Sequence, residues 1–309
     1  MTTLRELLQK FRPPEIIEAE ILLAHLLKKE RPFIISHGEK KITKRTAQHF
    51  ARLIQRKNRG EPLAYLLGQQ PFYGLNFIVN RRVLIPRPES EWLVEKSIEI
   101  LRQRRDINTI IDVGTGSGCI IISLLKNLTP ARQRRMTAYA TDISPAALTV
   151  AKRNAKTHNI TKIKFLHGNL LKPTNYLPAD ATHQALQAGK LPMLRSATQG
   201  KQAASSPVLL LANLPYLSTK DYNRAPLSVR RFEPKQALLA GHDGLKYYRR
   251  LVKQLSKFIN IEFHCLWEID PCHAKQISQL IKKYCPHAQM QIKKDLRGLN
   301  RYLSITIPK

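Results

Sequence analysis

Apolar residues in the first part of the chain recur at the spacing of a helix. In residues 13–30, PPEIIEAEILLAHLLKKE, they form one stripe behind a Pro-Pro-Glu start, which favours a helix N-terminus. A second helix is predicted over residues 44–57, with Thr43 as its N-cap. Residues 1–60 are therefore predicted to form a small helical domain.

The pattern changes between Gly60 and Glu91, where glycines, aromatic residues and two-residue alternation replace the helical period. Alternation of this kind predicts strands or a hairpin rather than a helix. We interpret residues 61–88 as a β-hairpin connector whose last part, the IPRPE stretch at 85–89, opens the next helix.

From residue 89 to residue 309, short apolar runs alternate with helical segments, which predicts an α/β domain. Strands are predicted at residues 109–114, 137–143, 162–168, 208–214, 263–269, 290–295 and 302–307. Helices are predicted at residues 89–103, 117–127, 145–157, 244–258 and 271–284. Such alternation is typical of a parallel sheet with helices on both faces. The last two strands have no helix between them, so we expect them to form an antiparallel hairpin at one end.

Residues 173–206 interrupt this alternation with Ala, Gln, Ser and Thr and show little periodicity. A segment of this length without regular structure is unusual inside a compact domain. We interpret it as a flexible surface insertion that holds at most a short helix near 180–188.

Composition places the chain among globular proteins, since 43% of its 309 residues are hydrophobic and 24% are charged. The N-terminus lacks the apolar core of a secretory signal, and no run of 18 apolar residues occurs. The four cysteines lack the spacing of a zinc site. We expect a cytoplasmic protein with reduced thiols, no metal and no membrane contact, present as a monomer.

The charge is strongly positive, because 52 Lys and Arg residues face 22 Asp and Glu residues and give a net charge of +30. A charge of this size favours polyanionic partners such as ribosomes, RNA or DNA. The basic clusters are scattered along the chain, so a basic surface with no charged partner stays an alternative.

The first candidate for chemistry is the stretch DVGTGSG at 112–118, which follows a predicted strand and opens a helix. Its glycines let a ligand lie against the turn and the helix N-terminus. Three closely spaced glycines also fit a dinucleotide site or a tight turn. The absence of a lysine from this loop argues against a phosphate-binding P-loop.

Asp142 ends the next predicted strand, where a carboxylate suits the two hydroxyls of a ribose. The alternative is an N-cap for the helix that starts near Ser144. Together with the glycine loop, the position favours the ligand.

The strand at 208–214 ends in Asn213-Leu214-Pro215-Tyr216. In a parallel sheet this end lies beside the ligand crevice. An amide, a fixed turn and a flat ring at such a place could grip a planar NH2 group. The alternative is an Asn-capped turn with a packed tyrosine.

These three features resemble class I S-adenosylmethionine-dependent methyltransferases that methylate amino or amide nitrogens. A narrower resemblance covers almost the whole chain and identifies it as similar to the peptide chain release factor N5-glutamine methyltransferases, the HemK/PrmC family. The stretches that carry it are AEILLAHLL, GEPLAYLLG, VLIPRPESEWLVE, DVGTGSGCI, TDISPAALTVAKRNA, RFEPKQALLAGHDGL and DLRGLNRYLSI.

The resemblance implies a seven-stranded Rossmann-like sheet with an antiparallel last strand and an N-terminal helical domain that binds the substrate. It implies methyl transfer from S-adenosylmethionine to the glutamine amide of the Gly-Gly-Gln motif in class 1 release factors. The implied cofactor residues are Gly114, Thr115, Gly116, Ser117, Gly118, Asp142, Asn169, Leu170 and Asn213. The implied catalytic residues are Asn213, Leu214, Pro215 and Tyr216, and the implied substrate-binding residues are these four with Arg87 and Glu89. Arg87, Pro88 and Glu89 would also help to close the pocket over the cofactor.

The chain departs from the family pattern at two places. Leu214 replaces the usual proline, a variant shared with RNA adenine dimethyltransferases, and Asn169-Leu170 replaces an acidic residue and an aromatic ring near the adenine. Three alternatives therefore stay open: methylation of a ribosomal-protein glutamine, methylation of an RNA or DNA adenine amino group, and a ribosome-associated binding protein without activity.

Overall fold

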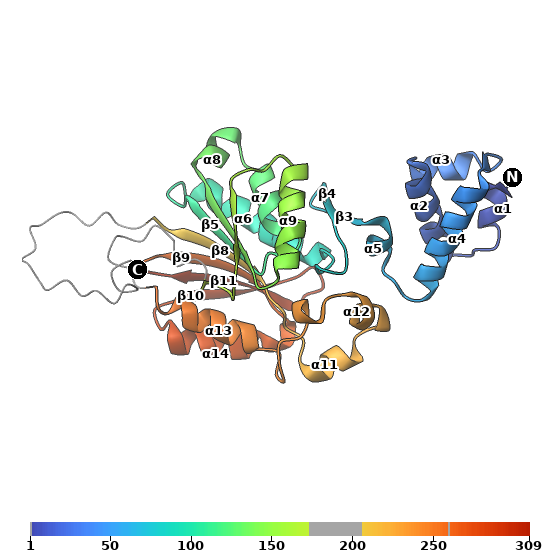
Figure 1. Cartoon of the computed structure of the whole chain (residues 1–309). Helices are drawn as coiled ribbons and strands as arrows, with labels where there is room; N and C mark the ends of the chain where they lie inside the picture. Colours follow the sequence, from blue (N-terminus) through green and yellow to red (C-terminus); the bar gives the residue numbers. More distant parts are fainter. Residues whose placement is uncertain (1, 173–205, 259) are drawn as a thin grey trace, which may run out of the picture.

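A seven-stranded sheet forms the centre of the chain, whose structure we describe from a computed structural model over residues 2–172, 206–258 and 260–309 (Figure 1). Its strands are β5 (Thr109–Val113), β6 (Thr137–Asp142), β7 (Ile163–His167), β8 (Val208–Asn213), β9 (Phe263–Glu268), β10 (Gln289–Lys294) and β11 (Asn300–Ile307). The strand order is β10-β11-β9-β8-β5-β6-β7. The pairs from β7 to β9 are parallel, and β11 is antiparallel to both β9 and β10. The predicted α/β sheet with an antiparallel last strand is confirmed.

Helices cover both faces of this sheet (Figure 1). One layer contains α6 (Glu91–Gln103), α7 (Cys119–Lys126) and α9 (Pro145–Thr157), and the other contains α13 (Lys246–Leu255) and α14 (Ala274–Tyr284). Alternate residues of β8 belong to opposite cores, with Leu209 and Leu211 packed in the core of α6 and α7, and Leu210 and Ala212 in the core of α13 and α14. Burial on both faces explains why this strand is an unbroken apolar run.

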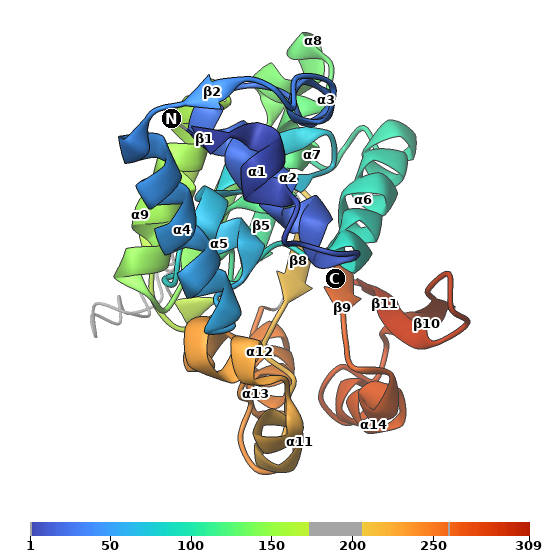
Figure 2. The same cartoon turned by 90° about the vertical axis from the view of Figure 1, so that its right-hand side faces the viewer.

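The N-terminal unit packs around its own hydrophobic core. Figure 2 views the molecule from the side of this unit. The unit contains α1 (Leu4–Leu8), α2 (Glu15–Leu27), α3 (Arg31–Ser36), α4 (Lys44–Asn58), α5 (Leu63–Leu67) and the short strands β1 (Thr2–Thr3) and β2 (Lys41–Ile42). The predicted cap is present, because the Thr43 hydroxyl accepts a hydrogen bond from the Thr46 amide. The helices predicted within residues 13–30 and at residues 44–57 are confirmed as α2 and α4.

The prediction of strands throughout the connector was wrong for residues 63–67, which form α5. Pro62 precedes this helix and Gly68 ends it in the left-handed conformation at φ +71°. The Tyr65 hydroxyl donates to the Val83 carbonyl at 2.6 Å, which holds the helix against the later part of the connector. The predicted hairpin follows as β3 (Gln69–Phe72) and β4 (Leu75–Ile78).

Among the described residues after β5, three further short helices occur outside the predicted pattern: α8 (Pro130–Arg135), α11 (Thr219–Arg224) and α12 (Leu227–Phe232). Three-residue 3-10 turns occur at η1 (Pro88–Ser90), η3 (Lys235–Ala237) and η4 (Pro271–His273). Residues 173–205 of the predicted insertion, with its possible helix at 180–188, lie outside the described residues. Within the described ranges, no helix is both long and apolar enough to cross a membrane.

Asn154 joins the hairpin to the glycine loop. Its side chain is completely buried and accepts a hydrogen bond from the Ile78 amide at 2.7 Å. The same side chain donates to the carbonyl oxygens of Ile78 at 3.0 Å and Ser117 at 2.8 Å. One side chain on α9 therefore fixes the edge of the hairpin against the loop that follows β5.

We predict that Asn154→Ala lowers the free energy of unfolding by ~2–4 kcal/mol, because three hydrogen bonds are lost and their backbone partners stay buried. Urea unfolding followed by circular dichroism measures this change. The control is Asn58→Ala, which removes an exposed amide and should change stability by less than ~0.5 kcal/mol. Equal stability of the two variants would contradict the role given to Asn154.

Candidate active site

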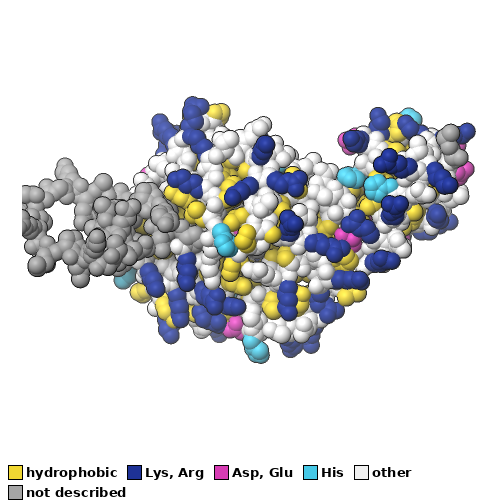
Figure 3. All heavy atoms as spheres, in the orientation of Figure 1, with side chains coloured by type: hydrophobic (Ala, Val, Ile, Leu, Met, Phe, Trp, Pro, Cys, Tyr) yellow, Lys and Arg dark blue, Asp and Glu magenta, His cyan; other side chains and the backbone are white. Residues whose placement is uncertain are grey.

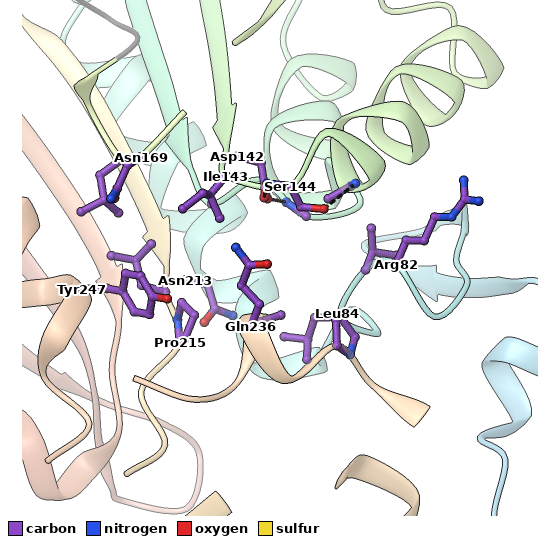
Figure 4. Close-up of a pocket in the computed structure, with 18 of the residues that line it drawn as sticks. Arg82, Leu84, Asp142, Ile143, Ser144, Asn169, Asn213, Pro215, Gln236 and Tyr247 are labelled. Carbon is purple, nitrogen blue, oxygen red and sulfur yellow. Dashed lines mark hydrogen bonds between the residues drawn. The ribbon is translucent and has the colours of Figure 1, made fainter. Parts of the chain in front are cut away.

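The carboxyl ends of β8, β5 and β6 meet at one pocket (Figure 4). β5 pairs with β6 on one side and with β8 on the other, so the order of the strands reverses there. Ligands of open α/β sheets bind at such a reversal. Gly114, Asp142 and Asn213 lie next to one another around this pocket, as the sequence predicts.

The glycine loop brings backbone close to the pocket. Gly114 and Gly116 line it with φ values of +74° and +55°, which favour glycine. The amides of Gly114 and Thr115 both donate to the Thr141 carbonyl, at 2.8 and 2.9 Å, and so tie the loop to β6. A methyl group on Gly114 would lie 3.1 Å from a methyl carbon of Leu214, so the two loops also touch each other.

The other loop residues lie behind this surface. Thr115 and Ser117 are buried and do not line the pocket, and neither does Gly118. At Gly118 an added Cβ would lie 2.8 Å from Ile122, so this glycine lets the helix α7 pack closely. The structure thus separates two pocket-lining glycines from three supporting residues.

Asp142 lines the pocket and organises it. Its Oδ2 accepts from the Gly116 amide at 2.9 Å and its Oδ1 from the Ser144 amide at 2.8 Å. The N-cap of α9 is Ser144 itself, whose side chain accepts from the Ala147 amide. The alternative in which Asp142 is the N-cap of α9 is therefore wrong. Burial raises the pKa of the Asp142 carboxyl group.

Asp112 is a buried carboxylate that the sequence analysis left without a role. Its Oδ2 accepts from the Thr115 hydroxyl at 2.6 Å, and its Oδ1 has no partner among the described residues. Burial is the main cause that raises the pKa of Asp112 to about 7, and the nearby charge of Asp142 adds to it. An acidic residue directly before a glycine loop was the signal that could have identified it.

The predicted adenine end of the pocket is mostly apolar. Asn169 and Leu170 both line it, as do Ile143 and Tyr247, which the sequence analysis did not select (Figure 4). Ile143 keeps 41% of its surface exposed there, which is unusual for an isoleucine after a buried strand. These side chains offer an apolar wall to a flat ring.

The residues from Asn213 to Tyr216 divide into two groups. Asn213, Leu214 and Pro215 line the pocket, and Leu214 is buried against the glycine loop. Tyr216 does not line it and packs against the core below. Burial raises the pKa of Tyr216 to about 12, so its hydroxyl stays protonated at neutral pH.

Arg87, Pro88 and Glu89 do not line the pocket either. Arg87 donates to the buried Glu233 at 2.5 Å, and the Glu89 carbonyl accepts from the Tyr302 hydroxyl at 2.9 Å. These bonds tie the connector to the end of α12 and to β11. The segment thereby supports the rim, where Arg82, Leu84 and Gln236 lie (Figure 4).

Two side chains behind Asn213 were missed by the sequence analysis. Ser90 ends η1, and Glu268 ends β9 in register with Asn213 on β8. Asn213 donates from its Nδ2 to Ser90 Oγ at 2.8 Å and to Glu268 Oε2 at 2.9 Å. A polar residue that ends an apolar strand was the available signal for Glu268.

One group outside the pocket has the side chains of a metal site. Possible ligand atoms of Asp270, Cys272 and His273 lie within 4.8 Å of one another. Asp270 already accepts from the Cys272 amide at 3.0 Å, and burial together with Asp270 raises the pKa of the thiol to about 12. We assign no metal to this group.

Comparison with known proteins agrees with this geometry. Residues 2–68 match the PrmC N-terminal domain and residues 105–191 match a methyltransferase domain. The release factor glutamine methyltransferase of Bacillus cereus is 32% identical over 285 residues, which cover 91% of this chain and 89% of that protein. The protein of the same name from Nitratidesulfovibrio vulgaris is 30% identical over 306 residues, covering 97% and 92%. The one from Enterococcus faecalis is 35% identical over 241 residues, covering 78% and 74%.

The first two relatives cover more than nine tenths of the chain and so extend over both the helical unit and the sheet. The chain belongs to the release factor glutamine methyltransferase family of S-adenosylmethionine-dependent enzymes.

Proposed function

We propose that this enzyme transfers a methyl group from S-adenosylmethionine to the side-chain amide nitrogen of the glutamine in the Gly-Gly-Gln motif of class 1 peptide chain release factors. The observation that carries the proposal is the position of Asn213, whose side chain lies at the pocket edge beside the glycine loop and Asp142. The family membership of the whole chain supports the choice of a release factor.

The residues around the pocket fit S-adenosylmethionine. Gly114 and Gly116 line the pocket without side chains and leave room for the amino-acid part. Asp112 lies behind this loop, outside the pocket lining, and holds it through the Thr115 hydroxyl. Asp142 offers carboxylate oxygens to the ribose, and Ile143 an apolar surface to the adenine. When bound, the cofactor supplies an electrophilic methyl group on a sulfonium.

The chain's own residues must make the amide reactive by positioning it. An amide nitrogen is a poor nucleophile because its lone pair is delocalised into the carbonyl. The Asn213 Oδ1 and the Leu214 carbonyl each accept one amide hydrogen in this proposal, which fixes the nitrogen and favours a more pyramidal geometry. Precise placement of reactants can account for about 7–11 kcal/mol of a barrier. No strong base is needed, because the proton can leave to water after methyl transfer.

The helical domain, residues 1–60 in our proposal, binds the release factor away from the pocket. Helix α4 carries exposed cations, among them Lys44, Arg45 and Arg52, on the side opposite its buried Phe50 and Leu53. Lys and Arg side chains also spread over the visible face of both units (Figure 3). We propose that the net charge of +30 adds a weak ribosome or RNA contact to a cytoplasmic monomer.

An adenine amino group is the second candidate substrate. Leu214 and the basic surface both favour this substrate. The amide of Asn213 could also bind an adenine NH2 group as well as a glutamine amide. Incubation with tritiated S-adenosylmethionine and, separately, purified release factor, ribosomal proteins or RNA distinguishes the candidates. We expect label on the release factor, whereas label on RNA alone would overturn the proposal.

We predict that Asn213→Ala reduces kcat by at least ~100-fold, because one of the two acceptors that hold the substrate amide is lost. The dissociation constant of S-adenosylmethionine, measured by calorimetry, should stay within a few-fold of the wild-type value. Turnover at the wild-type rate would remove Asn213 from the catalytic machinery.

We predict that Gly114→Ala weakens S-adenosylmethionine binding by ~10-fold or more. The added methyl group would crowd Leu214, and the alanine would have to adopt a positive φ. The matched control is Gly74→Ala, at φ +72°, where nothing lies within 4 Å of the added carbon. It carries the backbone strain without the contact, so its affinity should equal that of the wild type. Equal losses in the two variants would indicate a general loss of structure and would contradict the role given to the contact between Gly114 and Leu214.

We predict that Tyr216→Phe leaves the pH dependence of kcat unchanged between pH 7 and pH 10. The pKa of Tyr216 is raised to about 12 by burial, so the hydroxyl is protonated throughout this range and does not act as a base. Initial rates across this range test the expectation. A wild-type inflection near pH 10 that the phenylalanine variant lacks would show that the hydroxyl titrates during turnover.

A further inference from the structure

Two buried side chains, Ser90 and Glu268, form a closed triangle of hydrogen bonds with the half-buried Asn213 where β8 and β9 end. The Nδ2 of Asn213 donates to Ser90 Oγ at 2.8 Å and to Glu268 Oε2 at 2.9 Å, and Ser90 Oγ donates to the same Oε2 at 2.6 Å. Ser90 and Glu268 expose only 2% and 1% of their surface. The Tyr248 hydroxyl on α13 donates to the Glu268 carbonyl. This bond fixes the end of β9 from the face of the sheet that α13 and α14 cover.

The triangle determines which end of the Asn213 amide faces the pocket. A carboxylate only accepts, and the single Ser90 proton is directed to Glu268. Both groups therefore require a donor from Asn213, and its NH2 group supplies one hydrogen to each. With both NH2 hydrogens engaged in this way, Oδ1 is the atom of the amide that we propose accepts from a ligand. Amide orientation is normally assigned from such networks, since oxygen and nitrogen look alike in shape.

Rotation of the Asn213 amide by half a turn would have a high cost. It would place Oδ1 against the buried Glu268 carboxylate with no hydrogen between them. A carboxylate at position 213 would meet the same repulsion, because like charges this close cannot both be ionised. The triangle thus selects an amide over an acid at this position.

We propose that Glu268 and Ser90 are positioning residues that orient the Asn213 amide, and that Glu268 is the reason why position 213 holds an amide rather than a carboxylate. This inference rests on the proposed function, in which Asn213 accepts from the substrate amide. It also gives the IPRPES stretch a role beyond the rim. The bond from Arg87 to Glu233 anchors that stretch, and Ser90 at its end contacts the two strands.

The test exchanges the amide at position 213 with the carboxylate at position 268. We expect Asn213→Asp to lower kcat by about 100-fold, the loss typical of one misplaced hydrogen-bonding group in an active site. The double variant Asn213→Asp/Glu268→Gln again brings one carboxylate and one amide together, so its kcat should be at least ~10-fold above that of Asn213→Asp alone. The control Glu262→Gln removes a carboxylate at the far end of β9, where it bonds Arg104 and His264, and should behave as the wild type.

A second pair of variants avoids any charge change. Ser90→Ala removes one acceptor and the donor to Glu268, so kcat should fall, whereas Ser90→Thr keeps the hydroxyl and should keep most of the activity. The affinity for S-adenosylmethionine should stay within a few-fold in all these variants, which separates positioning from a general loss of structure.

The possible outcomes are distinct. A double variant no more active than Asn213→Asp, together with a Ser90→Ala variant as active as Ser90→Thr, would overturn the positioning role. Loss of cofactor affinity in parallel with kcat would assign these residues to the fold alone and would overturn it as well. If the wild type does not methylate a release factor, the proposed function itself fails, and that result is seen before any variant is compared.

Discussion

The buried carboxylate of Glu268 is the group around which the reactive end of the molecule is organised. Removing a carboxylate from water is costly unless hydrogen-bond donors replace the lost solvent. Ser90 and Asn213 supply such donors from two different segments, and burial still raises the pKa of Glu268 to about 7. In its ionised form this side chain only accepts hydrogen bonds, and in that form it holds the Asn213 amide in one orientation.

The order of the strands places the rest of the site around that amide. β8 lies between β9, which carries Glu268, and β5, which leads into the glycine loop, so the cofactor pocket and the buried carboxylate flank the same strand. Leu214 follows Asn213 and packs against Gly114, so the two loops share one contact. Its side chain fills space next to the glycine loop.

Periodicity and strand ends predicted most of this arrangement from the sequence. Apolar runs indicated all seven strands, and the rule that parallel strands end at one edge placed Gly114, Asp142 and Asn213 together. The helix at Leu63–Leu67 was not predicted because its five residues are too few to show a period beside strand-like neighbours. Ser90 and Glu268 were missed because their roles depend on the register between β8 and β9 and on where η1 packs. Arg87 and Glu89 were expected to close the pocket, and their bonds instead support its rim.

The central claim is that the orientation of Asn213 directs methyl transfer to a glutamine amide nitrogen. Tandem mass spectrometry of a class 1 release factor, after incubation with the enzyme and S-adenosylmethionine, locates the methyl group directly. We predict a single methyl group on the side-chain amide of the Gly-Gly-Gln glutamine. A methyl group on another residue, or an unmodified release factor beside methylated RNA, would contradict it.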